Sequence, residues 1–296
     1  MNNSRSMKAD LIVIGAGAIG LGLAVACISD NERVCLLGRN KIVESGLLNV
    51  STDTLDAEFD SGIDDEALIV VAVKDYDIDN AALEYERELA NASAIIALQN
   101  GLGSAERLKK QKCVIRAITW ACAQRVSQTE VSWKEPIKLA VENRVSKKLL
   151  TELISQQLAN RFVHVDFVPP DIFRVLQFEK LVVNITTNTL AAYFNMACAE
   201  LAKNHRAIQL AEAIADEVLA LSNASGISFR EDPKAIIRRA WMSMGEFKPS
   251  MLQDSHAGKP LELRSIVDEP LKLANSLKIP MPTLRVLSKA LHDRLT

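Results

Sequence analysis

One segment of the chain, FEKLVVNITTNTLAAYF at residues 178–194, combines apolar side chains with a narrow polar stripe. Lys180, Asn184 and Asn188 recur every four residues, so a helix would place them one above the other on a single face. Asn is a poor helix former, and a buried ammonium group is costly unless it is paired. A solvated face is usually wider and carries mixed charges, whereas this stripe is nearly neutral. The pattern favours a functional site over the wet face of an amphipathic helix.

A second pattern lies near the N-terminus, where three glycines follow the apolar run LIVIG in G-x-G-x-x-G spacing. Gly15 would permit a tight turn, Gly17 would let the backbone approach a pyrophosphate, and Gly20 would let the next helix pack closely on its strand. A helix N-terminus also supplies N–H donors to an anion. A glycine-rich turn without a ligand is the alternative. The predicted cofactor contacts are Gly15, Ala16, Gly17, Ala18, Ile19 and Gly20.

The end of the second apolar run indicates which dinucleotide would bind. An Asp or Glu there accepts hydrogen bonds from the ribose hydroxyls of NAD. This chain instead reads LLGRN, in which Gly38 removes the carboxylate and Arg39 offers a planar, charged fork. The sequence therefore predicts NADP(H), with Arg39 binding the 2′-phosphate and Lys41 as a second candidate cation, and a solvated surface arginine is the alternative.

Polar residues follow two further apolar runs. Lys74 comes directly after LIVVAV, and Asn100 and Gly101 follow IIAL. Ligands of open α/β sheets bind beyond the carboxyl ends of the strands, where these residues should emerge. A solvent-facing lysine and an ordinary Asn-Gly turn are the alternatives.

The chain of 296 residues divides into two regions that differ in their hydrophobic patterns. Up to the tandem prolines at 169–170, apolar β-branched runs alternate with helical stretches, which predicts a parallel sheet buried on both faces. Beyond them the periodicity is helical. The predicted fold class is α/β, with an N-terminal Rossmann-type sheet domain (1–170) that binds NADP and an all-helical C-terminal domain (171–296) that binds substrate. Strands are predicted at 11–15, 33–38, 67–73, 93–98 and 113–120, three more up to 168, and helices near 78–91, 146–160, 171–196, 199–224, 232–245, 259–277 and 282–294.

The composition excludes several classes of protein. Lys+Arg 35 against Asp+Glu 37 gives a net charge of −2, so no nucleic-acid partner is predicted. There is no apolar run long enough for a membrane span and no signal-peptide pattern, so a cytoplasmic protein is expected. The five cysteines are widely spaced without a CxxC pair, which predicts free thiols in a reducing compartment and no metal site.

Several motifs in one order resemble the ketopantoate reductase (2-dehydropantoate 2-reductase) family over nearly the whole chain. The helix and the two late segments carry the resemblance more specifically than the glycine motif does. The resemblance implies a Rossmann domain, a helical domain and NADPH-dependent reduction of a small 2-keto acid, ketopantoate, to its 2-hydroxy acid. The motifs are GAGAIG, Lys74, QNGLGS (99–104), FEKLVVNITTN (178–188), PSMLQD (249–254) and GKPLEL (258–263).

The resemblance also assigns roles to residues. Lys180 would be the general acid, and Glu262 would position the substrate hydroxyl and contact the cofactor. Asn100 would lie beside both nicotinamide and substrate, and Lys74 matches a family lysine at the edge of the cofactor cleft. On their own, Glu262 could be a first-turn glutamate favoured by the helix dipole, and Ser250 could cap a helix starting at Met251. The residues implied to hold substrate polar groups are Asn100, Asn184, Asn188 and Ser250.

Departures from the family pattern concern substrate choice. Arg264 replaces an acidic residue, Val267 and Asp268 stand where the family has Asn-Gly, and AITWACA with Trp120 and Cys122 replaces a small, Gly-containing exit. None of these removes a proposed catalytic group. A reductase of another 2-keto acid and a non-catalytic NADP-binding sensor are therefore the alternatives, and long apolar helices make a homodimer possible.

Overall fold

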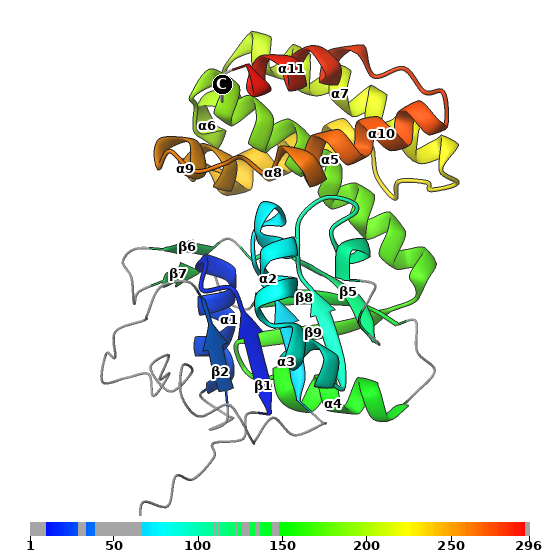
Figure 1. The fold of residues 1–296 in the computed structure, drawn as a ribbon. Helices are drawn as coiled ribbons and strands as arrows, with labels where there is room; N and C mark the ends of the chain where they lie inside the picture. The colour runs from blue at the N-terminus through cyan, green and yellow to red at the C-terminus, as the bar shows by residue number, and fades with distance from the viewer. Residues whose placement is uncertain are drawn as a thin grey trace, which may run out of the picture. The chain divides into compact units, whose positions relative to one another are not determined.

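A computed structural model describes residues 10–28, 34–38, 67–108, 111, 113–121, 123–125, 131–133, 137–143 and 148–293 of the chain. These residues belong to two compact units (Figure 1). The first consists of Met1–Gln99 with Ser104–Pro170, and the second of Asn100–Gly103 with Asp171–Thr296. The predicted fold class, a Rossmann-type α/β sheet followed by helices, is confirmed.

The first unit is built on a seven-stranded sheet of order β2-β1-β3-β4-β5-β8-β9. The first five strands in this order are parallel. The order reverses between β1 and β3, and such a switch point is where open α/β sheets bind ligands. The strands are β1 (Leu11–Ile14), β2 (Val34–Leu37), β3 (Leu68–Val71), β4 (Ala94–Ala97), β5 (Val114–Thr119), β8 (Ile137–Glu142) and β9 (Val163–Val168).

Two strands, β8 and β9, depart from the predicted parallel sheet. β8 runs antiparallel to β5, and β9 runs parallel to β8. The connection from β5 to β8 carries a short antiparallel pair, β6 (Ala123–Arg125) and β7 (Val131–Trp133), in place of a crossover helix. Because parallel pairing needs a crossover across the sheet, the chain without one returns in the opposite direction.

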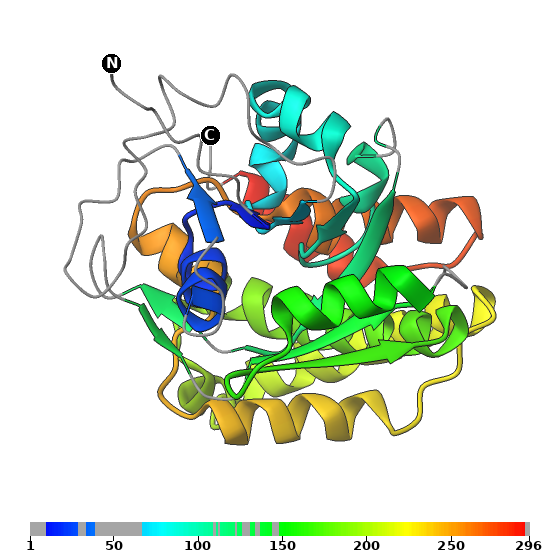
Figure 2. The same cartoon turned by 90° about the horizontal axis from the view of Figure 1, so that it is seen from below.

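Helices cover both faces of the sheet, as its continuous apolar runs predict. Leu11 and Val13 pack with α1 (Ala18–Ile28) and α4 (Lys148–Leu158) on one face. Figure 2 shows α4 lying along β9. The alternate residues Ile12 and Ile14 face the other core. That core contains side chains of α2 (Ile78–Glu84), α3 (Glu86–Asn91) and the short helix η2 (Ala105–Leu108), and a further short helix, η1 (Asp75–Asp77), precedes α2.

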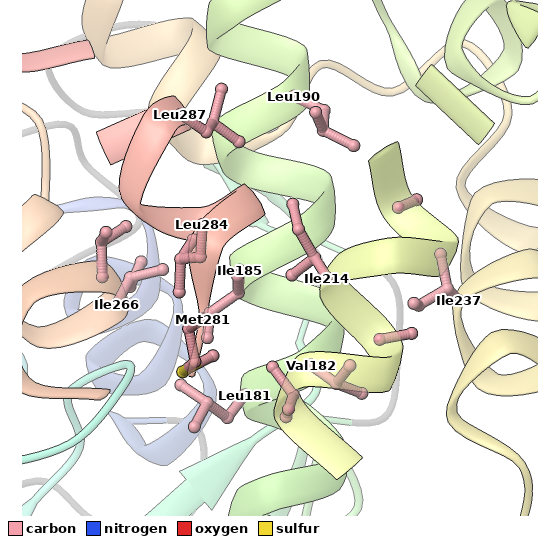
Figure 3. Packing of buried hydrophobic residues seen from close by; sticks show 14 of the residues in the cluster. Leu181, Val182, Ile185, Leu190, Ile214, Ile237, Ile266, Met281, Leu284 and Leu287 are labelled. Atoms are coloured by element: carbon pink, nitrogen blue, oxygen red, sulfur yellow. The ribbon is translucent and has the colours of Figure 1, made fainter. Parts of the chain in front are cut away.

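The second unit is helical and packs around α5. Leu181, Val182 and Ile185 of α5 are at most 1% exposed and meet apolar side chains of other helices, including Ile214 and Leu284 (Figure 3). Each such side chain contributes roughly 1.5–3 kcal/mol when fully buried. The helices are α5 (Pro170–Phe194), α6 (Cys198–Leu201), α7 (His205–Ala224), α8 (Pro233–Met244), α9 (Ser250–His256), the π-helical turn η3 (Arg264–Asp268), α10 (Glu269–Ser276) and α11 (Pro282–His292).

Three predicted helices differ in detail. The helix expected near 78–91 is divided at Tyr85 into α2 and α3. The helix expected at 199–224 is interrupted before α7, because the Asn204 side chain accepts a hydrogen bond from the N–H of Ala207 and caps a new helix. The helix expected at 259–277 begins only near residue 263 and opens with a π-helical turn. Among the described helices, none has the length and apolar character needed to cross a bilayer.

The described cysteines are free thiols, as predicted: Cys27 and Cys198 are buried, and Cys35 and Cys113 are partly buried. Cys122 lies outside the described residues. Burial raises the pKa of Cys35 on β2 from 9.0 to about 12, and the charge of Glu88 adds to the rise.

This pKa shift predicts a loss of stability in alkali. Above pH 9 the Cys35 thiol ionises in the unfolded chain but keeps its proton in the folded chain. The unfolded state then binds fewer protons, so the free energy of unfolding falls between pH 9 and about 12, with a slope of at most roughly 1.4 kcal/mol per pH unit. Urea unfolding at pH 8, 9 and 10 should show a shallower decline in Cys35→Ala than in the matched variant Cys113→Ala. Equal slopes in the two variants would contradict this account.

Candidate active site

The polar stripe lies along α5, whose apolar sides are buried in the second unit. Asn188 is 5% exposed, and Lys180 and Asn184 are partly buried. None of the three is exposed, so the stripe is not the solvated face of an amphipathic helix. Lys180 lies one helical turn before Asn184, which lies one turn before Asn188.

A chain of hydrogen bonds connects the stripe to two other segments of this unit. The N–H of Met251 and the Ser250 hydroxyl both donate to Oδ1 of Asn188, each at 3.5 Å. Nδ2 of Asn188 donates to Oδ1 of Asn184 at 3.5 Å, and Nδ2 of Asn184 donates to Oδ1 of Asn100 at 3.4 Å. Four predicted substrate residues, Asn100, Asn184, Asn188 and Ser250, are thus brought together.

The direction of this chain is fixed by a backbone group. The N–H of Met251 can only donate, so Asn188 must turn its amide oxygen toward α9 and its amide nitrogen toward Asn184. The same logic turns the nitrogen of Asn184 toward the oxygen of Asn100. The chain therefore ends in the amide nitrogen of Asn100, which is oriented to donate to an acceptor such as a carboxylate or carbonyl oxygen.

Ser250 does not act as the helix cap that was its alternative interpretation. It is the first residue of α9, and Pro249 at the N-cap position makes no capping bond with its side chain. The N–H of Met251 in the first turn is accepted by Asn188 of α5 instead. Ser250 belongs to the polar chain, with its hydroxyl beside the Asn188 amide.

Glu262 lies in the same unit, directly before Leu263 and the π-helical turn η3. The residue is only 4% exposed. Burying a carboxylate is costly, and such groups are retained where they meet a partner or perform a function. Arg264, two residues further on, is exposed.

The three glycines of the turn in the first unit differ in how much space surrounds them. Gly15 has φ +118°, and a Cβ there would lie 2.7 Å from the backbone carbon of Ala72. A Cβ at Gly20 would lie 1.9 Å from the carbonyl oxygen of Gly15. At Gly17, in contrast, no described residue comes within 4 Å of an added Cβ. The fold explains Gly15 and Gly20, whereas the open space at Gly17 fits the approach of a ligand to the backbone.

The other predicted cofactor residues are placed only in part. Gly38 follows β2, and a Cβ there would lie 2.6 Å from Cβ of Ala16, so this position has no room for the carboxylate of an NAD site. Arg39 and Lys41 lie outside the described residues. Lys74 is partly buried and precedes η1, three residues after β3 ends at the same edge of the sheet as β1.

Two sets of residues escaped the sequence analysis. Ser104 donates to Asp75 at 2.7 Å, and Arg107 donates to the Asp75 carboxylate at 3.1 Å, which fixes the start of η1 next to Lys74. Asp75 is 29 residues from Ser104 and 32 from Arg107, so no local pattern indicated this contact. Gln177, which donates to the carbonyl of Gly101 at 3.3 Å, could have been found, because it lies three residues before Lys180 on the same helix face.

Comparison with known proteins identifies the family. The model described as "Ketopantoate reductase PanE/ApbA" matches residues 11–144, and the model described as "Ketopantoate reductase PanE/ApbA C terminal" matches residues 173–294. The chain belongs to the ketopantoate reductase family. The members of this family are oxidoreductases that depend on a pyridine nucleotide.

Relatives and solved structures match over almost the full chain. A 2-dehydropantoate 2-reductase of Archaeoglobus fulgidus is 26% identical over 93% of this chain and 94% of its own length. The structure of 2-dehydropantoate 2-reductase from Geobacter metallireducens superposes with a TM-score of 0.80 at 24% identity, over 96% of this chain and 99% of that one. D-mandelate dehydrogenase in complex with NADH gives 0.79 at 20% identity, over 96% and 98%. At such identities the structures establish the shared ketopantoate reductase fold.

Proposed function

We propose that this member of the ketopantoate reductase family uses NADPH to reduce ketopantoate (2-dehydropantoate) to pantoate, a step of pantothenate and coenzyme A biosynthesis. The observation that carries the proposal is the connected chain Ser250–Asn188–Asn184–Asn100, of which Asn184 and Asn188 lie on the same face of α5 as Lys180. It supplies several neutral polar groups on the helix that carries this cation, as a small keto acid requires.

The proposed chemistry follows from the charges of the reaction. A 2-keto acid brings a carboxylate, which the amides of the chain and the Ser250 hydroxyl can bind without a further buried charge. When bound, the reduced nicotinamide supplies the hydride. Addition to the ketone leaves an alkoxide, and Lys180 donates the proton that converts it to the hydroxyl. Glu262 holds the resulting hydroxyl group in position.

The dinucleotide is proposed to bind at the glycine turn of the first unit. Gly17 leaves its backbone open at the start of α1, and the N–H groups of this helix end favour phosphate oxygens. Because Gly38 leaves no room for an acidic side chain, the site is expected to prefer NADPH over NADH. Arg39 is the proposed partner of the 2′-phosphate. Ala16, Ala18, Ile19, Lys74, Asn100 and Glu262 complete the proposed contacts.

Replacement of Gly17 by alanine tests this site. The new methyl group meets no described residue, so the melting temperature should stay within about 2 °C of the wild-type value. The affinity for NADPH, measured by fluorescence titration, should fall at least tenfold because the methyl group occupies the space of the pyrophosphate. Gly20→Ala, whose Cβ would meet the carbonyl oxygen of Gly15, should instead lower the melting temperature. Unchanged affinity in Gly17→Ala would contradict the proposed site.

A second candidate is the reduction of a different 2-keto acid. Trp120 at the carboxyl end of β5 is 45% exposed, and Arg264 is exposed near Glu262, at positions where the family usually has other residues. The solved D-mandelate dehydrogenase carries NADH and anilino(oxo)acetate, so this fold accommodates a carboxylate with an aromatic substituent and the other dinucleotide.

A substrate panel decides between the candidates. The oxidation of NADPH and of NADH is followed at 340 nm with ketopantoate and with linear, branched and aromatic 2-keto acids. We expect the highest kcat/KM with ketopantoate and NADPH. A faster aromatic or linear acid would support the second candidate. Dinucleotide binding without turnover of any acid would indicate a sensor protein and refute the enzyme proposal.

We also propose a homodimer. A neighbouring structure from Staphylococcus aureus is described as a dimeric ketopantoate reductase, and it superposes with a TM-score of 0.77 over 96% of this chain. Sedimentation equilibrium at micromolar concentration measures the mass directly.

A further inference from the structure

Four residues of the chain, Asn100–Gly103, leave the first unit and become part of the helical unit. The N–H of Leu102 donates to the carbonyl oxygen of Ser265 at 2.9 Å. Nε2 of Gln177 donates to the carbonyl oxygen of Gly101 at 3.3 Å. This loop, which we call the Asn100 loop, is therefore held through its backbone by the two elements that carry the polar stripe and Glu262.

The Asn100 loop binds to the π-helical turn η3 (Arg264–Asp268). π-Helical turns inside helices are rare and are frequently found at functional sites. Here Ser265 is fully buried and its carbonyl oxygen accepts a hydrogen bond from outside its own helix. The turn begins two residues after Glu262, so one short segment carries both a proposed catalytic group and the docking carbonyl.

Gly101 can pack against the backbone of this turn because it lacks a side chain. Its φ is +83°, and a Cβ would lie 2.2 Å from the carbonyl oxygen of Ser265 and 2.4 Å from the carbonyl carbon. Both of those atoms are backbone, so they cannot swing away as the end of a side chain could. Any side chain at Gly101 must therefore push the loop off the turn.

The backbone dock is a stronger restraint on Asn100 than its side-chain contact. The Asn184–Asn100 hydrogen bond is 3.4 Å long, near the limit at which such contacts contribute, whereas the Leu102–Ser265 bond has an ordinary length of 2.9 Å. Asn100 precedes Gly101 in the chain, so its position follows the dock.

We propose that docking of Gly101 and Leu102 on the π-helical turn at Ser265 positions the Asn100 amide for the reaction, an inference that rests on the function proposed above. Gly101 is then a positioning residue, which acts by allowing the backbone contact at Ser265. The π-helical turn is then part of the active-site scaffold.

The chain contains a matched control for this role. Gly103 has φ +82°, so alanine there suffers the same backbone strain as alanine at Gly101. Its added Cβ would lie 3.0 Å from Cγ of Glu269, a side-chain atom that can move. The pair Gly101→Ala and Gly103→Ala thus separates the loss of the dock from the cost of a positive φ.

The experiment measures kinetics and amide exchange in both variants. We expect Gly101→Ala to raise the KM for the 2-keto acid at least tenfold and to speed hydrogen exchange of the Leu102 amide. The Kd for NADPH should change less than threefold, because only the proposed Asn100 contact is lost and those at the glycine turn remain. Gly103→Ala should keep the wild-type KM within threefold and retain slow exchange. Asn100→Ala should lose as much as Gly101→Ala, and the double variant should lose no more than either single variant, because both remove one interaction.

Several outcomes would overturn the role of the dock while wild-type turnover is normal. These are equal losses in Gly101→Ala and Gly103→Ala, rapid exchange of Leu102 in the wild type, or independent losses that multiply in the double variant. If Gly101→Ala melts far below Gly103→Ala and no longer binds NADPH, the glycine serves folding and the positioning role is refuted. A wild-type chain that reduces no 2-keto acid would refute the proposed function itself.

Discussion

Alanine in place of Lys180 is expected to lower kcat for 2-keto acid reduction by a factor of about 10²–10⁴. The reason is that the alkoxide formed by hydride addition has no other proposed proton donor, while hydride transfer without proton transfer is uphill. The affinity for NADPH should not change, because the proposed dinucleotide contacts at the glycine turn do not involve this residue. Steady-state kinetics at saturating NADPH, with a fluorescence titration of the dinucleotide, measure both quantities.

Two variants separate proton donation from charge. Lys180→Arg keeps a cation near the substrate carboxylate but cannot give up its proton at neutral pH. It should recover part of the KM for the 2-keto acid and little of kcat. Lys289→Ala, which removes an exposed lysine of α11, should behave as the wild type. If the kcat of Lys180→Ala stayed within tenfold of the wild-type value, Lys180 would not be the general acid.

The sequence contained most of the information on elements and their chemistry. Apolar β-branched runs predicted β1 and β3, because strands buried on both faces leave no polar position. The spacing of Lys180, Asn184 and Asn188 predicted a polar face, and the structure connects two of these residues to Ser250 and Asn100. Local periodicity was sufficient in these cases because each pattern belongs to a single helix or strand.

The parts that escaped prediction depend on contacts between distant segments. No residue pattern in the sequence distinguishes the π-helical turn at Arg264–Asp268 from an ordinary α-helix. Its role in binding the backbone of Leu102 through Ser265 could be recognised only in the structure. A loop of four residues that joins another unit is likewise too short to change the local composition. The reversal of β8 followed from the missing crossover helix after β5, not from the residues of β8, whose apolar run is compatible with either direction.

The largest expected effect on stability concerns a buried ion pair in the sheet. Arg116 of β5 donates to both oxygens of the Glu142 carboxylate, at 2.8 Å from Nε and 2.5 Å from Nη2. The Glu142 side chain is 0% exposed, whereas that of Arg116 is 18% exposed. The pair joins β5 to β8, where the sheet changes from parallel to antiparallel pairing.

This difference in exposure predicts unequal costs for the two single substitutions. Arg116→Met removes the cation that faces a carboxylate out of reach of water and should lower the free energy of unfolding by about 3–5 kcal/mol. Glu142→Gln leaves the arginine, which can still reach solvent, and should cost about 1–3 kcal/mol.

The double variant Arg116→Met/Glu142→Leu tests the origin of the cost. It removes both charges together and should recover most of the lost stability, because a buried ion pair and apolar groups of similar volume are often nearly equivalent. Urea unfolding followed by circular dichroism gives the three free energies. If the single costs were equal, or if they simply added in the double variant, the pair would act through packing, and the buried charge would not be what makes Arg116 necessary.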